Sequence, residues 1–178
     1  MNEVVKTILE RRSVRKFDQR PVEEAIVHEI IECGRSAPNA WGHQTFEFYA
    51  ITDRKLMREL AELTAKFLGG EPEDHLFFSA PLIILISDIR DNYMRLADAG
   101  CAMENMFLAA RSQGVGSVWI NQFSPICDKL EVIDKFESIG IAKNRVVTSL
   151  GAFGYPAEEP KPKELISAVH YIRSEAEA

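Results

Sequence analysis

Cysteine and histidine are scarce in this chain. Its 178 residues include three cysteines, none of them in a CxxC pair, and four histidines, none of them in an HExxH pattern. Disulfide scaffolds need closely spaced cysteine pairs, and zinc sites need clustered cysteine or histidine ligands. The sequence therefore argues against a disulfide scaffold and against a metal site, and it is typical of a reducing compartment such as the cytoplasm.

Long apolar runs and an excess of positive charge are lacking too. The longest apolar run, residues 81–86, suits a buried strand and is too short to cross a bilayer. No basic segment followed by an apolar stretch opens the chain, so we expect no signal peptide. A net charge of −6 gives no general attraction to nucleic acid or to anionic membranes. We therefore expect neither as a partner, and any phosphate site must gather its basic residues locally.

Helix-like and strand-like patterns follow one another irregularly. Apolar spacing predicts helices over about 2–12, 21–34, 54–67, 93–113 and 124–136, and strands over about 45–52, 82–87, 117–120 and 145–151. Gly34 is expected to end the second helix. Because no regular βαβ repeat appears, we predict an α+β three-layer sandwich with residues 1–178 as a single domain.

Two features raise the question of a second subunit. The tail, about residues 156–178, has few core partners in the sequence, so we expect it to dock on another copy of the chain. The long helix around residues 93–113 carries the small residues Ala97, Ala99, Gly100 and Ala102. Small side chains let another backbone approach closely, which suits either tight packing within the chain or a subunit interface.

Two basic segments are candidates for an anion site. In the extended segment Arg11-Arg12-Ser13-Val14-Arg15-Lys16, alternate side chains share a face, so Arg11, Ser13 and Arg15 would point together. Two guanidinium groups and a hydroxyl suit a phosphate. Lys161-Pro162-Lys163, held extended by its prolines, could supply a second clamp. Taken singly, the first segment is also compatible with a solvated helix end and the second with a solubilising tail.

Two less charged segments could meet a flat heterocycle. Residues 37–44, APNAWGHQ, offer backbone donors and acceptors, and Trp41 could cover a ring. Residues 114–123, GVGSVWINQF, run from a glycine turn into a strand end, but they match neither GxGxxG nor GxxxxGK[ST]. Alone, the first is also an ordinary helix-to-strand loop and the second a plain strand with its flanks. No GxSxG nucleophile motif occurs.

Taken in order, these four segments resemble the FMN-dependent nitroreductase family. Gly154-Tyr155-Pro156 before the proline-rich tail matches it as well, and the similarity runs nearly from end to end. The resemblance implies a three-layer α/β/α sandwich with a mainly antiparallel central sheet. It also implies an intertwined homodimer with two FMN sites at the interface.

The resemblance assigns roles to residues at both ends of the cofactor. The FMN phosphate, ribityl chain and pyrimidine edge fall to Arg11, Arg12, Ser13 and Arg15, with Lys161 and Lys163 reaching the phosphate. The loop that meets the isoalloxazine, usually from the partner subunit, corresponds to Pro38, Asn39, Ala40 and Gln44. The segment whose backbone lies near the reactive N5 corresponds to Asn121 and Gln122. Departures from the family pattern surround the acceptor side, so they bear on the substrate more than on the cofactor.

The activity that the resemblance implies is a ping-pong oxidoreduction. NADH or NADPH would reduce FMN at N5, and a small electrophilic acceptor such as a nitroaromatic or quinone would take the electrons. The flavin carries this chemistry, so no catalytic side chain is assigned. Three alternatives stay open: a same-fold enzyme for dehalogenation, azoline oxidation or flavin breakdown, a protein that binds FMN without turnover, and an acidic scaffold without a cofactor.

Overall fold

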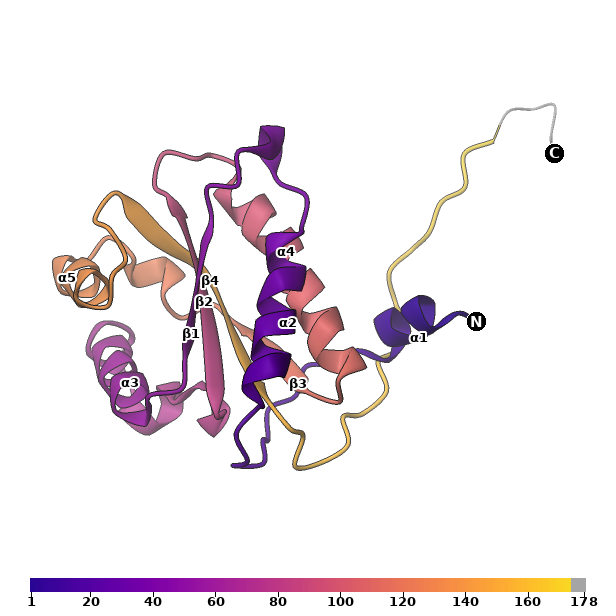
Figure 1. Ribbon diagram of the computed structural model, residues 1–178, viewed down its shortest axis with the longest axis horizontal. Helices are drawn as coiled ribbons and strands as arrows, with labels where there is room; N and C mark the ends of the chain where they lie inside the picture. Colours follow the sequence, from indigo (N-terminus) through magenta and orange to yellow (C-terminus); the bar gives the residue numbers. More distant parts are fainter. Residues whose placement is uncertain (174–178) are drawn as a thin grey trace.

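Four antiparallel strands form one sheet between two layers of helices (Figure 1). The computed structural model describes residues 1–173 and orders the strands β1-β2-β4-β3. The strands are β1 (Glu47–Ile51), β2 (Leu82–Ile89), β3 (Gly116–Ile120) and β4 (Arg145–Gly154). The predicted α+β sandwich with an antiparallel central sheet is confirmed.

Helices cover both faces of this sheet. The helices of residues 1–173 are α1 (Glu3–Glu10), α2 (Glu24–Arg35), α3 (Arg54–Leu68), α4 (Arg95–Ser112) and α5 (Leu130–Ser138). Short 3-10 turns are η1 (Ala40–Gly42), η2 (Pro72–His75), η3 (Phe77–Ser79) and η4 (Ser124–Ile126). Helices α2 and α4 pack on one face, and α3 and α5 pack on the other (Figure 1).

Strand β2 explains why the sheet is covered on both sides. Leu82, Ile84 and Ile86 join the core beneath α2 and α4, whereas Ile83 and Leu85 face α3 and α5. All five side chains are fully buried. A strand that is apolar on both faces is stable only in the middle of a sheet with two helical layers, which is the position β2 takes.

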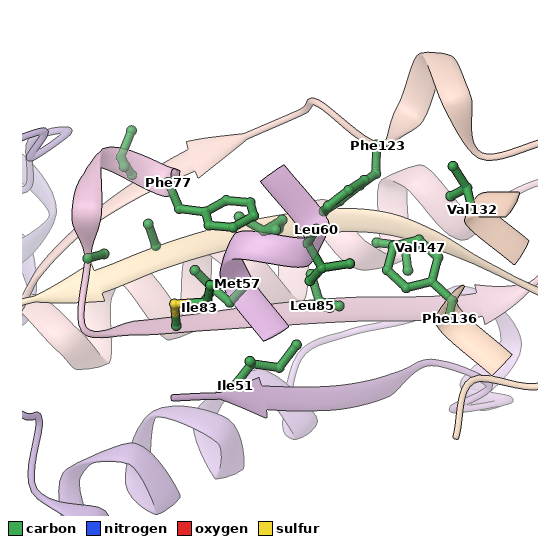
Figure 2. Packing of buried hydrophobic residues seen from close by; sticks show 14 of the residues in the cluster. Ile51, Met57, Leu60, Phe77, Ile83, Leu85, Phe123, Val132, Phe136 and Val147 are labelled. Atoms are coloured by element: carbon green, nitrogen blue, oxygen red, sulfur yellow. The ribbon is translucent and has the colours of Figure 1, made fainter. Parts of the chain in front are cut away.

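The core on the side of α3 and α5 also draws residues from loops. Met57 and Leu60 of α3 and Phe136 of α5 belong to one buried cluster with the rings of Phe77 and Phe123 (Figure 2). Phe77 precedes β2 and Phe123 follows β3. The two buried rings therefore anchor the segment before β2 and the segment after β3 in the same core.

Two predicted helix boundaries were wrong. Gly34 lies inside α2, where an added Cβ would come 2.7 Å from Met106 Cγ, so the glycine permits close packing against α4 rather than ending the helix. The helix predicted over 124–136 is divided into η4 and α5. Lys129 is extended between them, with φ −73° and ψ 130°, and this break lets Ile126 and Val132 both reach the core.

Helix α1 and the tail lie outside the sandwich (Figure 1). Asn2 caps α1 as predicted, because its Oδ1 accepts a hydrogen bond from Val5 N at 2.9 Å. None of the residues of α1 is buried. Residues 157–173 form no helix or strand and extend away from the core, and residues 174–178 of the predicted tail lie outside the described part. No helix within residues 1–173 is long and apolar enough to cross a membrane.

Candidate functional site

The basic segment after α1 is held along the outer edge of β3. Val14 N donates to Ser117 O at 2.9 Å, and Ser13 forms a parallel bridge with Ser117. Val14 is buried against Gly116, where an added Cβ would lie 2.7 Å from Val14 Cγ2. Because side chains alternate in an extended segment, the buried Val14 leaves its neighbours Ser13 and Arg15 exposed to solvent.

A hollow of about 600 Å³ lies between this segment and the start of the tail. Its lining consists of Arg11, Arg12, Ser13, Val14 and Arg15 from one side, and Glu158, Glu159, Pro160, Lys161, Pro162 and Lys163 from the other. Five cations against two carboxylates leave it with a net charge of +3 in a chain of net charge −6. The structure thus brings the two predicted basic segments together, and a phosphate is the kind of group they attract.

Two of these five cations are already engaged. Arg11 Nε lies 3.2 Å from Glu104 Oε1, and its guanidinium carbon lies 5.9 Å from the centre of the Phe107 ring. Arg12 Nη1 donates to the carbonyls of Leu9 and Arg11, both at 2.6 Å, so it satisfies the carbonyl end of α1. Arg11, Ser13 and Arg15 line the same hollow, and the Arg11 side chain also contacts Glu104 and Phe107 of α4.

The other three cations are available to a ligand. The side chains of Arg15, Lys161 and Lys163 make no ion pair within residues 1–173. The Arg15 guanidinium lies 6.0 Å from the centre of the Phe78 ring. Lys16, next to Arg15, is paired instead with Glu158 at 2.8 Å and does not line the hollow.

The loop that contains Pro38, Asn39, Ala40 and Gln44 lies at the far end of α4 from the hollow (Figure 1). Ala40 N donates to the buried Asp98 in the first turn of α4 at 2.9 Å, and Gln44 N donates to Asn39 Oδ1 at 2.9 Å. Arg111, in the last turn of α4, contacts Glu10 beside the hollow at 3.0 Å. Thirteen residues of helix separate Asp98 from Arg111, which is about 20 Å. The loop and the hollow therefore do not meet within one subunit.

Asn121 and Gln122 follow β3 and differ in orientation. Asn121 is exposed. Gln122 Nε2 donates to Thr64 Oγ1 at 3.2 Å and to His75 O at 3.4 Å, so its side chain ties the end of β3 to α3 and η2. Ser117 forms the bridge to Ser13, and four residues of strand separate Ser117 from Asn121, which is about 13 Å.

Three residues that shape this region carried no sequence signal. Glu104 holds Arg11, Asp98 holds the loop at Ala40, and Phe78 lies beside Arg15. Each contacts a residue that is far away in the sequence, so no local sequence pattern could have predicted the contact. Within residues 1–173, no three histidine, cysteine, aspartate or glutamate side chains are grouped so that they could hold a metal ion.

Comparisons with known proteins show which family the chain belongs to. A crystal structure of a nitroreductase with bound FMN from Bacteroides fragilis is 32 % identical, superposes with a TM-score of 0.86, and covers 98 % of this chain and 99 % of that one. An NADPH-flavin oxidoreductase from Vibrio harveyi is 26 % identical over 94 % of this chain and 72 % of its own length. An FMN reductase (NADPH) from Bacillus subtilis is 26 % identical over 96 % of this chain and 74 % of its own length. The sequence model of the nitroreductase family matches residues 8–155, from α1 to the end of β4, and the chain belongs to the nitroreductase family.

Proposed function

We propose that this protein is an FMN-dependent oxidoreductase that takes electrons from NADH or NADPH and passes them to a small electrophilic acceptor such as a nitroaromatic or quinone. The observation that carries this proposal is the basic hollow between residues 11–15 and the tail in an otherwise acidic chain. The similar Bacteroides fragilis structure contains FMN, and two relatives are named for NADPH oxidation with a flavin.

The residues of the hollow fit a flavin that carries a phosphate. The Ser13 hydroxyl and the unpaired Lys161 and Lys163 supply donors and positive charge for the phosphate. Arg15 presents a free guanidinium whose planar fork matches the two acceptor atoms at the edge of a pyrimidine ring. Arg11 and Arg12 fix the wall behind them, through Glu104 and the end of α1, and add to the positive field.

Bound FMN would supply the ring that accepts and releases hydride. The chain's own part is to bind and orient that ring. Arg15, which makes no ion pair within residues 1–173, would supply positive charge near the ring and so favour the negative charge that develops on reduction. The roles proposed for Arg15 and Ser13 are to supply positive charge and a hydrogen bond, and neither role transfers a proton. We therefore assign no side chain as a catalytic acid.

We propose that a second copy of the chain completes the site. The loop at Asn39 lies about 20 Å from the hollow along α4, so its contact with the same ligand requires another subunit. Val4 and Ile8 of α1 and Ile172 of the tail expose 67 %, 48 % and 98 % of their surface. Exposed apolar area of this extent favours association at roughly 25 cal/mol for each Å² covered. A homodimer that covers α1 and the tail accounts for both observations.

We place the protein in the cytoplasm. Cys33, Cys101 and Cys127 are all free thiols in the structure, which suits a reducing compartment.

The test of the flavin assignment is the visible absorption spectrum of the purified protein, with and without added FMN. We expect a bound-flavin spectrum that bleaches when NADH or NADPH is added without oxygen. Binding without bleaching would indicate a protein that holds FMN without turnover, and a chain that ignores added FMN would contradict the proposal.

Substitution of the free cations locates the cofactor. We expect the double change Arg15→Ala and Lys163→Ala to raise the dissociation constant for FMN by about a hundredfold or more, because each charge-assisted contact contributes about 1.5–3 kcal/mol. The matched control is Lys16→Ala, which removes a neighbouring cation paired with Glu158. Equal flavin affinity in the double variant and the control would contradict the site.

A further inference from the structure

The turn η3, just before β2, has a left-handed backbone. Phe77, Phe78 and Ser79 have φ values of 53°, 56° and 55°. For every residue except glycine this region brings Cβ close to the following carbonyl oxygen, and three such residues in succession are rarer still. A conformation of this kind persists only where the surroundings impose it, and such places gather at ligand sites.

The surroundings of η3 fix both of its ends. At the start, Phe77 is buried in the core with its ring centre 6.3 Å from that of Phe123 (Figure 2). At the end, Ser79 O accepts a hydrogen bond from Gln19 Nε2 at 3.2 Å, and Ala80 O accepts one from Arg54 Nη1 at 2.8 Å. Arg54 Nη2 also donates to Gln19 Oε1 at 3.0 Å, which locks the two donors together.

The result of this fixation is that Phe78 stands out from the surface. Its side chain is 45 % exposed although the ring of Phe77, next to it, is buried. The exposed ring lies beside Arg15, with 6.0 Å between the guanidinium carbon and the ring centre. The pair therefore offers a flat apolar surface next to an unpaired cation on the rim of the basic hollow.

We propose that Phe78 contacts the flat conjugated ring that binds beside Arg15, and so influences which ring systems the site accepts. A planar ring with acceptor atoms on its edge matches both members of the pair. The Phe78 ring can pack against the face or edge of such a ligand, and the Arg15 guanidinium can donate to the ligand's acceptor atoms. The isoalloxazine of FMN and a planar acceptor such as a quinone share this chemistry. The inference rests on the proposed function of the hollow.

The experiment compares three variants with the wild-type chain. Phe78→Leu removes the ring and keeps an apolar side chain, Phe78→Tyr keeps the ring, and Ser79→Gly alters the same turn without touching Phe78. Each is titrated with FMN by flavin fluorescence, and KM is measured for 1,4-benzoquinone and for ferricyanide, which has no aromatic ring. Thermal unfolding reports whether each variant folds.

If Phe78 contacts the flavin, Phe78→Leu raises the FMN dissociation constant about tenfold. If Phe78 contacts the acceptor, Phe78→Leu leaves the FMN dissociation constant unchanged and raises KM for benzoquinone about tenfold, while KM for ferricyanide stays the same. In both cases Phe78→Tyr and Ser79→Gly stay near the wild type. Phe78→Asn, which tolerates a left-handed backbone, replaces Phe78→Leu if the latter does not fold.

The inference is overturned if the ring-deleted variant binds FMN and both acceptors within twofold of the wild type. A wild-type chain that fails to bind FMN would overturn the proposed function and this inference together. Normal flavin binding by the wild type with no effect at Phe78 would overturn this inference alone.

Discussion

At the scale of single residues, backbone conformation and side-chain roles at this site are decided by neighbours. Arg12 would be free to bind an anion in an isolated peptide, but here its Nη1 satisfies the carbonyls of Leu9 and Arg11. Arg15, three residues further, faces solvent because Val14 is buried. Similar side chains in one motif therefore do different work.

Ser79 gives a prediction about the cost of the left-handed turn. Ser79 has φ at 55° and an exposed side chain that makes no hydrogen bond within residues 1–173, so it carries backbone strain that glycine would not. We expect Ser79→Gly to raise the free energy of unfolding by about 1 kcal/mol, because relief of the left-handed penalty outweighs the greater freedom of the unfolded chain. Urea unfolding with an unchanged slope checks this result. A lower midpoint would mean that the turn is not strained.

Ser149 gives a second residue-scale prediction. Its Oγ is buried in β4 and has no hydrogen-bond partner within residues 1–173. A buried hydroxyl that makes no bond loses its hydration without compensation, which costs about 1–3 kcal/mol. We expect Ser149→Ala to stabilise the protein by about 1 kcal/mol in urea unfolding. Thr148→Ser, at a neighbouring residue whose hydroxyl donates to Ile86 O at 3.0 Å, retains its hydrogen bond and serves as the control.

At the scale of elements, the fit between β3 and the segment after α1 decides where the basic residues lie. A Cβ at Gly116 would come 2.7 Å from Val14 Cγ2 and 3.1 Å from Pro156 Cγ. Val14 is β-branched and cannot swing aside. We expect Gly116→Ala to destabilise the protein by about 1–3 kcal/mol and to weaken FMN binding, because Ser13 and Arg15 move with Val14. Unfolding and flavin titration measure the two effects.

Gly100 in α4 provides the matched control for this prediction. The nearest atom to an added Cβ there is Trp119 Cη2 at 4.0 Å, so Gly100→Ala has the room that Gly116→Ala lacks. Alanine also favours the helix over glycine. If Gly116→Ala and Gly100→Ala weakened FMN binding equally, the contact between Gly116 and Val14 would not be what positions the basic residues.

Helices α3 and α5 are joined across the sheet face by an ion pair, and this predicts a pH dependence. The hydrogen bond from Lys135 holds the pKa of the Glu59 carboxyl below its ordinary value. A carboxyl whose pKa is lower in the folded state stabilises the fold above its unfolded pKa of about 4.3 and loses that contribution as the pH falls through the folded value. We expect Glu59→Gln to be less stable than the wild type at pH 7, with the difference vanishing in more acidic solution. A difference that persists at pH 2 would contradict the ion pair as its source.

At the scale of the whole molecule, the prediction concerns assembly. Ile8 of α1 borders an apolar groove of about 370 Å³ that Leu108 and Ala109 of α4 also line. If a second copy covers this region, Ile8→Glu places a charge in the interface, and burial of an unpaired charge is strongly unfavourable. We expect sedimentation velocity to show a dimer for the wild type and a monomer with at least tenfold weaker FMN binding for Ile8→Glu. A wild-type monomer that binds FMN would contradict the shared site.

The sequence by itself determined most of the elements and the order of the candidate binding segments. Unbroken apolar residues made β2 recognisable as a central strand, and the basic and proline-containing segments identified the two sides of the hollow, because these features depend on residues close in sequence. Only the tertiary structure decided that Gly34 packs against Met106, that Glu104 occupies Arg11, that Phe78 stands beside Arg15, and that the loop at Asn39 lies far from the hollow. Those outcomes depend on contacts between residues distant in sequence, which form only when the sheet and its helices are packed.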